Sequence, residues 1–278
     1  MKKGFKVYGI IGIILIFLME LNFFLKIQPF ANWYFPIIWI SYILVVDAII
    51  FKLNGSSLIS SRFKIFLGMV IISALFWYIF ELTNVFINNW QYQGTEGLGV
   101  TKNLFGFISF ATILPALFET FELIRSIKLF EKEKLKKSHK ITKPFLYTLI
   151  SIGIIFLILP VFLPTFTFPL VWLSFFLIFD PINYLNNQPS IIGHLKDKKL
   201  AVPLSILLSG IILGFFWEFW NYWAIPKWTY NIPFVDFFKI FEMPLLGYLG
   251  YFPFALEMYS MYWLTASLFK QKEKMLYD

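Results

Sequence analysis

Long apolar stretches recur along the whole chain and constrain its fold more than any other feature. Each stretch is close to the ~20 residues that an α-helix needs to cross the roughly 30 Å hydrocarbon core of a bilayer. Charged residues make up 14% of the 278 residues, well below the roughly 25% of a typical soluble domain. We therefore predict an all-α integral membrane protein with about eight transmembrane helices. The predicted helices cover residues 8–25, 34–51, 65–88, 103–124, 144–161, 166–183, 201–222 and 243–268.

Basic residues gather on one side of this predicted bundle. Eight crossings place both termini on the same side of the membrane, and all but four of the 24 Lys and Arg residues fall on that side. The four exceptions are Lys26, Lys102, Lys227 and Lys239. By the positive-inside rule, we predict a multi-pass protein of a cell membrane, the inner membrane of a bacterium, with cytoplasmic N- and C-termini. The net charge of +8 then belongs to the cytoplasmic rim, and we expect no nucleic-acid partner.

The two halves of the chain share short motifs in the same order, at offsets of 133 to 138 residues. Such a pattern indicates duplication and fusion. We predict a first four-helix repeat at 1–130, a basic cytoplasmic linker at 131–143 and a second four-helix repeat at 144–278. Because each repeat holds an even number of spans, the two tandem repeats should be parallel. The matched motifs are Phe35–Ser41 with Phe168–Ser174, Asp47 with Asp180, Asn54 with Asn187, Glu81-x-x-Asn84 with Glu218-x-x-Asn221, Trp90-x-Tyr92 with Trp228-x-Tyr230, and Pro115-x-x-x-Glu119 with Pro253-x-x-x-Glu257.

Acidic residues fall within or at the edges of the predicted spans, where basic residues are missing. An ionisable residue inside a span costs at least ~2.5–3.5 kcal/mol, so it normally faces the bundle interior and has a partner or a function. Carboxyl groups gathered in this way are suited to donate or carry protons. The acids concerned are Glu20, Asp47, Glu81, Glu119, Glu122, Asp180, Glu218, Glu242 and Glu257.

The matched acids supply the candidate site. A spacing of three residues places Glu218 and Asn221 on one helix face, and Glu81-x-x-Asn84 repeats that arrangement. We expect one desolvated pocket shared by the two repeats, and an interhelical hydrogen bond without function is the structural alternative for the Glu-x-x-Asn pairs. The candidate catalytic residues are Glu218, Glu257, Asn221, Glu81 and Glu119, and the candidate substrate-binding residues are Trp217, Trp228, Tyr230, Glu242 and Tyr259.

Other acids have simpler interpretations. We predict that Asp47 and Asp180 accept hydrogen bonds from the backbone of the segments that follow them, and that Glu122 forms an interfacial ion pair with Arg125. The stretch between the last two predicted helices is rich in proline and aromatic residues, and we interpret it as a stiff lid or as an aromatic belt at the membrane interface.

Several chemistries find no support in the sequence. The chain has no cysteine, and its two histidines, His139 and His194, fall in polar loops, which argues against a thiolate or histidine metal site. A carboxylate site for magnesium or calcium is the remaining metal alternative. Phosphate-binding glycine loops, Asp-rich diphosphate motifs and the His-Glu-x-x-His signature are missing. We predict no cofactor and no resident metal.

The motifs resemble those of the integral-membrane lycopene cyclases of carotenoid synthesis. The likeness is carried by the Trp-x-Tyr pairs and by a proline followed by a glutamate: Trp228, Tyr230, Pro253, Glu257 and Tyr259, with Trp90, Tyr92, Pro115 and Glu119 in the first half. The resemblance implies tandem helical repeats in which paired acids protonate a polyene and guide ring closure, although the adjacent Glu-Glu of that family is missing here. The chain also resembles uncharacterised bacterial polytopic membrane proteins with Trp-Glu-Phe-Trp-Asn and Phe-Glu-Met-Pro-Leu motifs.

Three functions follow as hypotheses. The first is a membrane-embedded enzyme or binding protein for an apolar lipid or isoprenoid, in which Glu218 and Glu257 are acids and Asn221 orients them. The second is a proton- or cation-coupled transporter, which the two-fold repeat and the buried acids favour. The third is a membrane assembly protein without chemistry. The expected partners are the lipid bilayer and an apolar small molecule or lipid, with a homo-oligomer as an open alternative.

Overall fold

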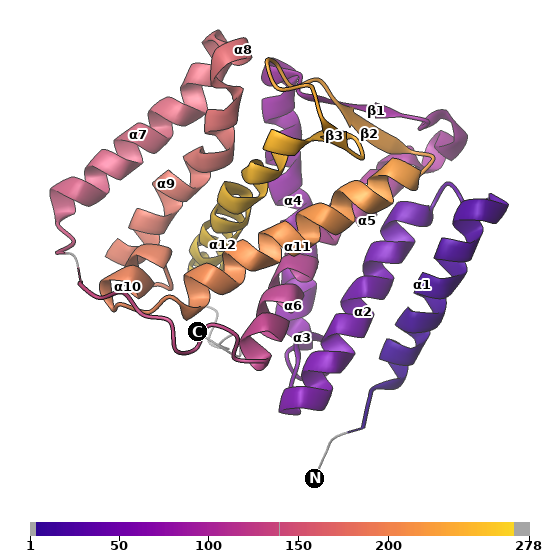
Figure 1. The fold of residues 1–278 in the computed structure, drawn as a ribbon, viewed down its shortest axis with the longest axis horizontal. Helices are drawn as coiled ribbons and strands as arrows, with labels where there is room; N and C mark the ends of the chain where they lie inside the picture. Colours follow the sequence, from indigo (N-terminus) through magenta and orange to yellow (C-terminus); the bar gives the residue numbers. More distant parts are fainter. Residues whose placement is uncertain (1–3, 139, 270–278) are drawn as a thin grey trace.

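The structure, a computed structural model, describes residues 4–138 and 140–269, so His139 and both chain ends lie outside the described residues. It is a bundle of helices with two small two-stranded ladders at one end (Figure 1). The long helices are α1 (Val7–Leu25), α2 (Tyr34–Asn54), α4 (Phe63–Ile87), α5 (Lys102–Ala111), α6 (Ile113–Ser126), α7 (Lys143–Phe162), α9 (Val171–Leu185), α11 (Ala201–Trp223) and α12 (Tyr251–Leu268).

Shorter elements connect the long helices. They are the helices α3 (Leu58–Ser61), α8 (Pro164–Thr167) and α10 (Ile191–Lys196), the 3₁₀ turns η1 (Glu96–Thr101), η2 (Phe168–Leu170) and η3 (Leu245–Gly250), and the strands β1 (Trp90–Gln93), β2 (Lys227–Tyr230), β3 (Lys239–Ile240) and β4 (Met243–Pro244). The strands lie at one end of the bundle, and α3 and α10 lie at the other (Figure 1). We call these the strand end and the α3/α10 end.

Helices long and apolar enough to cross a membrane dominate the described chain. Seven segments meet this criterion: Val7–Leu25, Tyr34–Asn54, Phe63–Ile87, Glu96–Ser126, Lys143–Phe162, Pro164–Leu185 and Ala201–Trp223. The helix α12 is not among the seven, but it packs inside the bundle against α9 and α11. The prediction of an all-α, multi-pass membrane protein is thus confirmed, with seven candidate spans among the described residues where the sequence analysis expected about eight.

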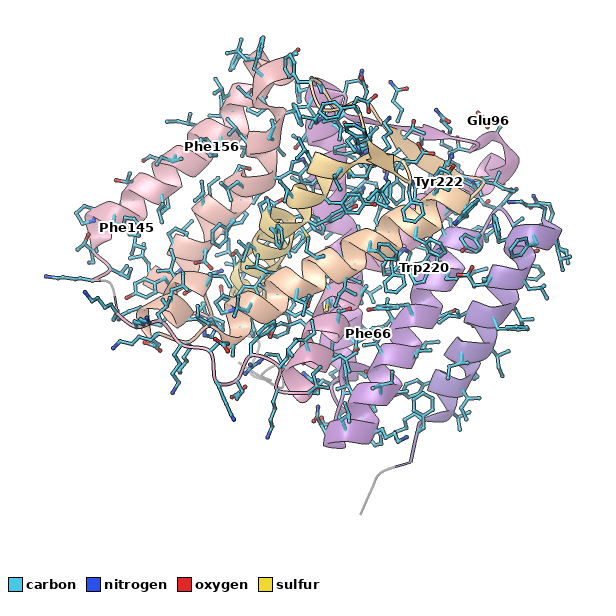
Figure 2. All side chains as sticks on the ribbon, viewed as in Figure 1. Phe66, Glu96, Phe145, Phe156, Trp220 and Tyr222 are labelled. Atoms are coloured by element: carbon cyan, nitrogen blue, oxygen red, sulfur yellow. The ribbon has the colours of Figure 1, made fainter. Side chains whose placement is uncertain are left out.

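The outermost helices are α1 and α7, at opposite edges of the bundle (Figure 1). Helix α1 packs mainly on α2 and helix α7 mainly on α9, and both expose apolar side chains on their other faces, such as Phe17 and Phe162. These faces suit contact with lipid tails. Inside the bundle, side chains fill the space between the helices (Figure 2), and the labelled Trp220 donates to Glu20 of α1 at 3.0 Å.

The predicted helix 103–124 is broken into α5 and α6 at Thr112. Pro115 causes this break, because it has no backbone N–H and its ring clashes with the carbonyl of the residue four positions earlier. Ser73 of α4 bonds to the backbone groups at the break: its hydroxyl donates to the Phe110 carbonyl at 2.6 Å and accepts from the Leu114 N–H at 3.0 Å. The bend is therefore held by a neighbouring helix.

The predicted helix 243–268 begins later than expected, at Tyr251. Its first eight residues instead form β4 and η3. Pro244 cannot donate a backbone hydrogen bond, and Pro253 lies in the first turn of α12, where proline is tolerated. The preceding lid segment is also more ordered than a plain loop, since it contains β2 and β3, and β3 pairs with β4.

Aromatic rings join the two halves of the chain. Trp39 of α2 contacts Trp217 of α11, with ring centroids 5.3 Å apart. Phe80 of α4 stacks on Trp172 of α9 at 5.4 Å. In both contacts a helix of one half packs its ring against a helix of the other half, so the aromatic core of the bundle holds the halves together.

Candidate functional site

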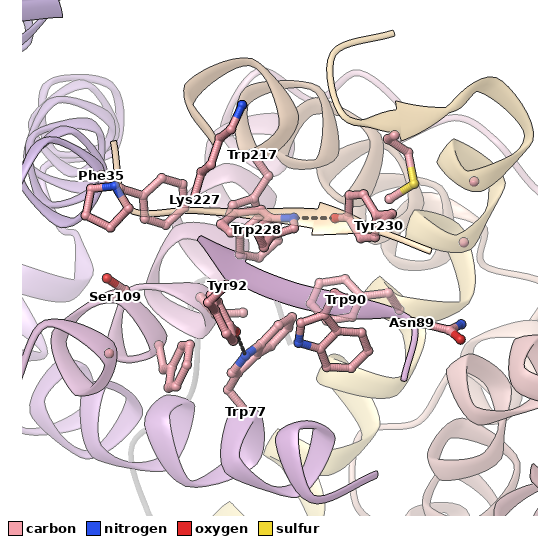
Figure 3. A pocket seen from close by; sticks show the side chains of 18 of the residues that line it. Phe35, Trp77, Asn89, Trp90, Tyr92, Ser109, Trp217, Lys227, Trp228 and Tyr230 are labelled. Atoms are coloured by element: carbon pink, nitrogen blue, oxygen red, sulfur yellow. Dashed lines mark hydrogen bonds between the residues drawn. The ribbon is translucent and has the colours of Figure 1, made fainter. Parts of the chain in front are cut away.

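An apolar cavity of about 470 Å³ lies at the strand end of the bundle. Its wall is built from both halves of the chain and is rich in aromatic residues (Figure 3). A cavity of this size and composition is typical of a site for a small apolar molecule, for which the usual range is roughly 300–1,000 Å³. The aromatic side chains of its wall include Phe35, Trp77, Trp90, Trp172, Trp217, Trp228 and Phe254.

The strands β1 and β2 form one wall of the cavity. They pair antiparallel, so that Trp90 lies opposite Tyr230 and Tyr92 lies opposite Trp228. The two predicted Trp-x-Tyr motifs are therefore the two strands of one ladder, and all four of their aromatic residues line the cavity. The sequence analysis matched these motifs but did not predict that they pair with each other.

The two matched asparagines fasten these strands to the helices. The amide nitrogen of Asn221 donates to the Trp228 carbonyl at 2.8 Å, and its oxygen accepts from the Trp228 N–H at 2.9 Å. Asn84 bonds to the backbone of Trp90 in the same way, at 2.8 and 3.3 Å. Each asparagine thus satisfies both backbone groups of a cavity-wall tryptophan, which accounts for an amide at this position.

Glu218 lies directly behind the cavity wall. It is fully buried, and its Oε1 atom accepts from the hydroxyls of Tyr230 at 2.7 Å and Tyr251 at 2.5 Å. The indole N–H of Trp228 donates to the Tyr230 hydroxyl at 2.6 Å (Figure 3). Burial, reinforced by the neighbouring Glu218, raises the pKa of Tyr230 well above its usual range, so this phenol keeps its proton and acts as a donor.

Glu81 occupies the corresponding place in the first half. It accepts from the Tyr92 hydroxyl and from the indole N–H groups of Trp77 at 2.7 Å and Trp90 at 3.1 Å. These three donors all line the cavity. The cavity wall therefore presents two constellations in which tyrosine and tryptophan side chains bond to a glutamate behind them, and proton transfer between cavity and carboxylate would run through the phenols.

The other predicted site residues are distributed over the bundle. Glu242 pairs with Lys227, a cavity residue, at 2.6 Å. Tyr259 lies away from the cavity, and its hydroxyl is 3.4 Å from Nε2 of His194. Glu119 and Glu257 are fully buried in α6 and α12, apart from the cavity lining. Asp47 lies beside the carboxyl group of Glu119, and the backbone of Phe175 lies beside that of Glu257. Neither carboxyl group forms a hydrogen bond of normal geometry among the described residues.

The structure therefore assembles part of the predicted site. The cavity wall includes Trp217, Trp228 and Tyr230, with Glu218 and Glu81 bonded directly behind it. Sequence reasoning missed Trp77 and Tyr251, both of which bond to these glutamates. The position that matches Tyr251 in the first half is Ile113, so the repeat pattern contained no signal for it.

The aspartates at the α3/α10 end act as predicted. Asp47 accepts from the Ile59 N–H and the Ser57 hydroxyl, both at 2.8 Å, and Asp180 accepts from the Ile191 and Ile192 N–H groups at 2.7 and 2.9 Å. Each aspartate holds the start of the short helix that follows it. The interpretation of both as structural caps is confirmed.

The structure describes ion pairs of Glu122 with Arg62 and of Arg125 with Glu131. Both oxygens of Glu122 accept from the guanidinium of Arg62 at 2.6 Å, and Arg125 lies 3.0 Å from Glu131. A bidentate pair of this kind suits a buried position, because the planar guanidinium matches the carboxylate. The pair Arg62–Glu122 joins α6 to the start of α4.

Comparison of the chain with protein-family models, with curated proteins and with solved structures gives no match. Among residues 4–138 and 140–269, no group of three or more His, Asp or Glu side chains is arranged to hold a metal ion. The geometry of the cavity is therefore the basis for a functional proposal.

Proposed function

We propose that the protein is a membrane-embedded enzyme or binding protein for an apolar lipid or isoprenoid, which it holds in the aromatic cavity at the strand end. The cavity itself is the observation that supports this function most directly. Its wall offers aromatic faces and very little polar surface, and its position beside apolar helices suits a molecule that partitions into the bilayer. In this proposal Glu218, reached through Tyr230 and Tyr251, is the acid/base group.

The proposed chemistry follows from the positions of the phenols and the carboxylate relative to the cavity. A ligand in the cavity touches the phenols first, and the phenols bond to a carboxylate that is shielded from water. Such a relay can deliver or remove a proton at an apolar substrate, and the surrounding indole and phenyl rings can stabilise a positive charge that develops on it. Glu257 lies outside this relay, so Glu218 is the better supported of the two acids that the sequence analysis proposed.

A cavity-filling variant tests binding. Gly106 of α5 lines the cavity, and Gly68 of α4 does not; a Cβ atom added to either residue would meet no atom of another residue closer than 3.7 Å. We expect Gly106→Leu to displace the apolar molecule that co-purifies with the wild-type protein in native mass spectrometry, and Gly68→Leu to retain it. Identical spectra for both variants, with the bound molecule present, would reject the cavity as the site.

A second variant tests the chemistry. Glu218→Gln keeps the shape of the side chain and removes its acid/base function. We expect the variant to retain the bound molecule while the apolar-lipid profile of the native host loses the product of the reaction. Glu96→Gln, a change in an exposed acid, is the matched control. A normal lipid profile with Glu218→Gln would leave binding without catalysis as the function.

The tandem repeat is part of the same proposal, and matched contacts support it. Asp47 and Asp180, 133 residues apart, each cap the short helix that follows. Glu81-x-x-Asn84 and Glu218-x-x-Asn221 each bond to a Trp-x-Tyr strand through the same atoms. Under this proposal the cavity lies on the pseudo-two-fold axis, where the two copies of the strand pair.

We propose the orientation of the protein in the membrane from the positions of its basic residues. The linker 131–138 runs along the α3/α10 end, where the Leu135 N–H donates to the Lys198 carbonyl at 3.1 Å. Lysines of the linker and of the α10 region are thereby collected on one face, which suits the cytoplasmic side. We accordingly place the termini in the cytoplasm and the cavity near the opposite face of a bacterial inner membrane.

A proton-coupled transporter is the second candidate, and one observation favours it. Glu119 and Glu257 are buried, lie apart from the cavity and form no hydrogen bond of normal geometry among the described residues, although Asp47 lies beside Glu119. Intramembrane acids of this kind are frequent in proton pathways. Proton flux in proteoliposomes that falls in a Glu119→Gln, Glu257→Gln double variant would favour this candidate, and absence of flux in the wild type would remove it.

A further inference from the structure

The cavity wall contains two buried polar atoms that have no hydrogen-bond partner among the described residues. They are Oγ of Ser109, on α5, and Oδ1 of Asn89, directly before β1. The two residues are 6% and 4% exposed, and both line the cavity. Figure 3 shows Ser109 and Asn89 on opposite sides of the cavity's labelled aromatic residues.

Hydroxyls without a partner are the exception among the buried residues that the structure describes. Several other buried serines on the helices bond to the carbonyl one turn earlier, such as Ser41 to Ile37 at 2.7 Å and Ser209 to Ser205 at 2.7 Å. Ser109 makes no such bond and lies against the cavity instead. Because a buried polar group without a hydrogen bond lowers stability, each such group calls for a partner.

Two hydrogen bonds fix the backbone of Asn89. Its backbone N–H donates to Oδ1 of Asn84 at 2.8 Å, and its carbonyl accepts from the Asn231 N–H at 2.8 Å. The side-chain oxygen that remains is an acceptor without a donor among the described residues, so a donor on the occupant of the cavity would satisfy it. A hydroxyl group satisfies this requirement, and a hydroxyl can also donate to or accept from Ser109.

The charged residues around the cavity favour a ligand whose polar group is neutral. Lys227, which lines the cavity, is paired with Glu242 at 2.6 Å, and Lys102 lies exposed at the cavity surface. The unpartnered atoms in the buried wall belong to a neutral amide and a neutral hydroxyl. This combination suits an uncharged alcohol better than a carboxylate or a phosphate.

We propose that the cavity selects an apolar molecule that bears a hydroxyl group, bound by Ser109 at one side or by Asn89 at the other. This inference rests on the proposed function and narrows its substrate class from apolar lipids in general to apolar alcohols. A hydrocarbon would fill the same volume and leave both polar atoms unpaired.

The test compares farnesol with farnesene, which has the same carbon skeleton but carries one further double bond in place of the hydroxyl. Binding to the purified full chain in nanodiscs is followed by quenching of the cavity tryptophans. We expect farnesol to bind about 5- to 10-fold more tightly, as one net hydrogen bond implies. Ser109→Ala or Asn89→Ala should remove this preference and leave farnesene binding unchanged.

Two control variants make the outcome specific. Ser205 is also buried with an unpartnered hydroxyl but lies outside the cavity lining, so Ser205→Ala should leave both affinities unchanged. Ser109→Thr keeps a hydroxyl and should keep any preference that Ser109→Ala removes. Equal wild-type affinity for both probes, or a preference that survives both alanine variants, would overturn the inference while leaving the proposed function intact. Failure of the wild type to bind either probe would count against both.

Discussion

Buried polar side chains in this bundle fall into two groups at the scale of single residues. Those that shape the backbone are fully bonded: Asp180 accepts from two N–H groups, and Asn221 bonds to both backbone groups of Trp228. Those in the cavity wall or in mid-bundle, such as Ser109 and Glu257, have atoms without partners among the described residues. The fully bonded side chains stabilise the backbone of the fold. The side chains with unpartnered atoms are the places where we expect ligands or protons to bind.

Removing the charge of Asp180 should destabilise the protein. In Asp180→Asn, the new amide nitrogen cannot accept one of the two N–H bonds at the start of α10, and we expect a loss of about 1–3 kcal/mol in the free energy of unfolding. Thermal unfolding in detergent, compared with the exposed control Asp197→Asn, measures the loss. Equal melting temperatures for the two variants would contradict a capping role.

His194 should make stability depend on pH. Burial, with a contribution from the nearby Lys199, lowers its pKa to about 4 from an ordinary value of 6.5. Between these values the unfolded chain binds a proton that the folded protein does not bind, so the free energy of unfolding falls as the pH is lowered from 6.5 to 4. We expect His194→Gln to flatten this dependence in melting curves. A slope equal to that of the wild type would show that other groups cause it.

At the scale of elements, the segment between α11 and α12 departs most from regular structure. Phe234, Phe238 and Phe241 all adopt positive φ angles, of 66°, 49° and 60°, which is uncommon for bulky residues. Phe238 is 80% exposed, while neighbouring residues such as Val235 and Met243 line the cavity. The segment thus covers the cavity with one side and presents phenylalanine rings with the other.

We predict that this segment dips into the bilayer interface. Aromatic rings favour that zone, and the chain has no cysteine, so a single Phe238→Cys can carry a polarity-sensitive fluorophore without background labelling. In liposomes the label should show blue-shifted emission and quenching by a lipid-attached quencher. The same label on Glu96→Cys provides an exposed reference. Stronger quenching of Phe238→Cys by iodide than by the lipid-attached quencher would contradict the prediction.

At the scale of the whole molecule, the bundle has two distinct ends. The strand end contains the cavity, and the α3/α10 end contains the short capped helices and the basic linker (Figure 1). Aromatic contacts between the halves, such as Trp39 with Trp217, lie in the core of the bundle. The cavity therefore depends on both halves of the chain.

Opposite exposure of the two ends is a direct prediction of this arrangement. Glu96 near the strand end and Lys136 in the linker are both exposed. Single cysteines at these positions should react with a membrane-impermeant maleimide from opposite sides of the membrane. Glu96→Cys should react in intact cells, and Lys136→Cys should react only after the membrane is opened to expose its cytoplasmic face. Labelling of both positions from the same side would contradict the proposed topology.

The class of the protein and most of its helices follow from the amino-acid sequence alone. Apolar length sets a span, so the predicted 8–25 and 144–161 match α1 and α7 closely. The interpretation of Asp47 and Asp180 as caps was also correct, because a cap depends on residues close by in the chain. Residues such as Pro115 break a helix through local sterics, yet the sequence analysis placed the α5–α6 region in one helix.

How the functional groups meet depends on the packing of the helices and strands in three dimensions. The pairing of β1 with β2 joins residues more than 130 positions apart, and the partners of Glu218 include Tyr251, which no matched motif contains. The same arrangement leaves Glu119 and Glu257 away from the cavity. Periodicity and spacing report which face of an element is apolar, whereas a site at the junction of two halves depends on how whole elements pack.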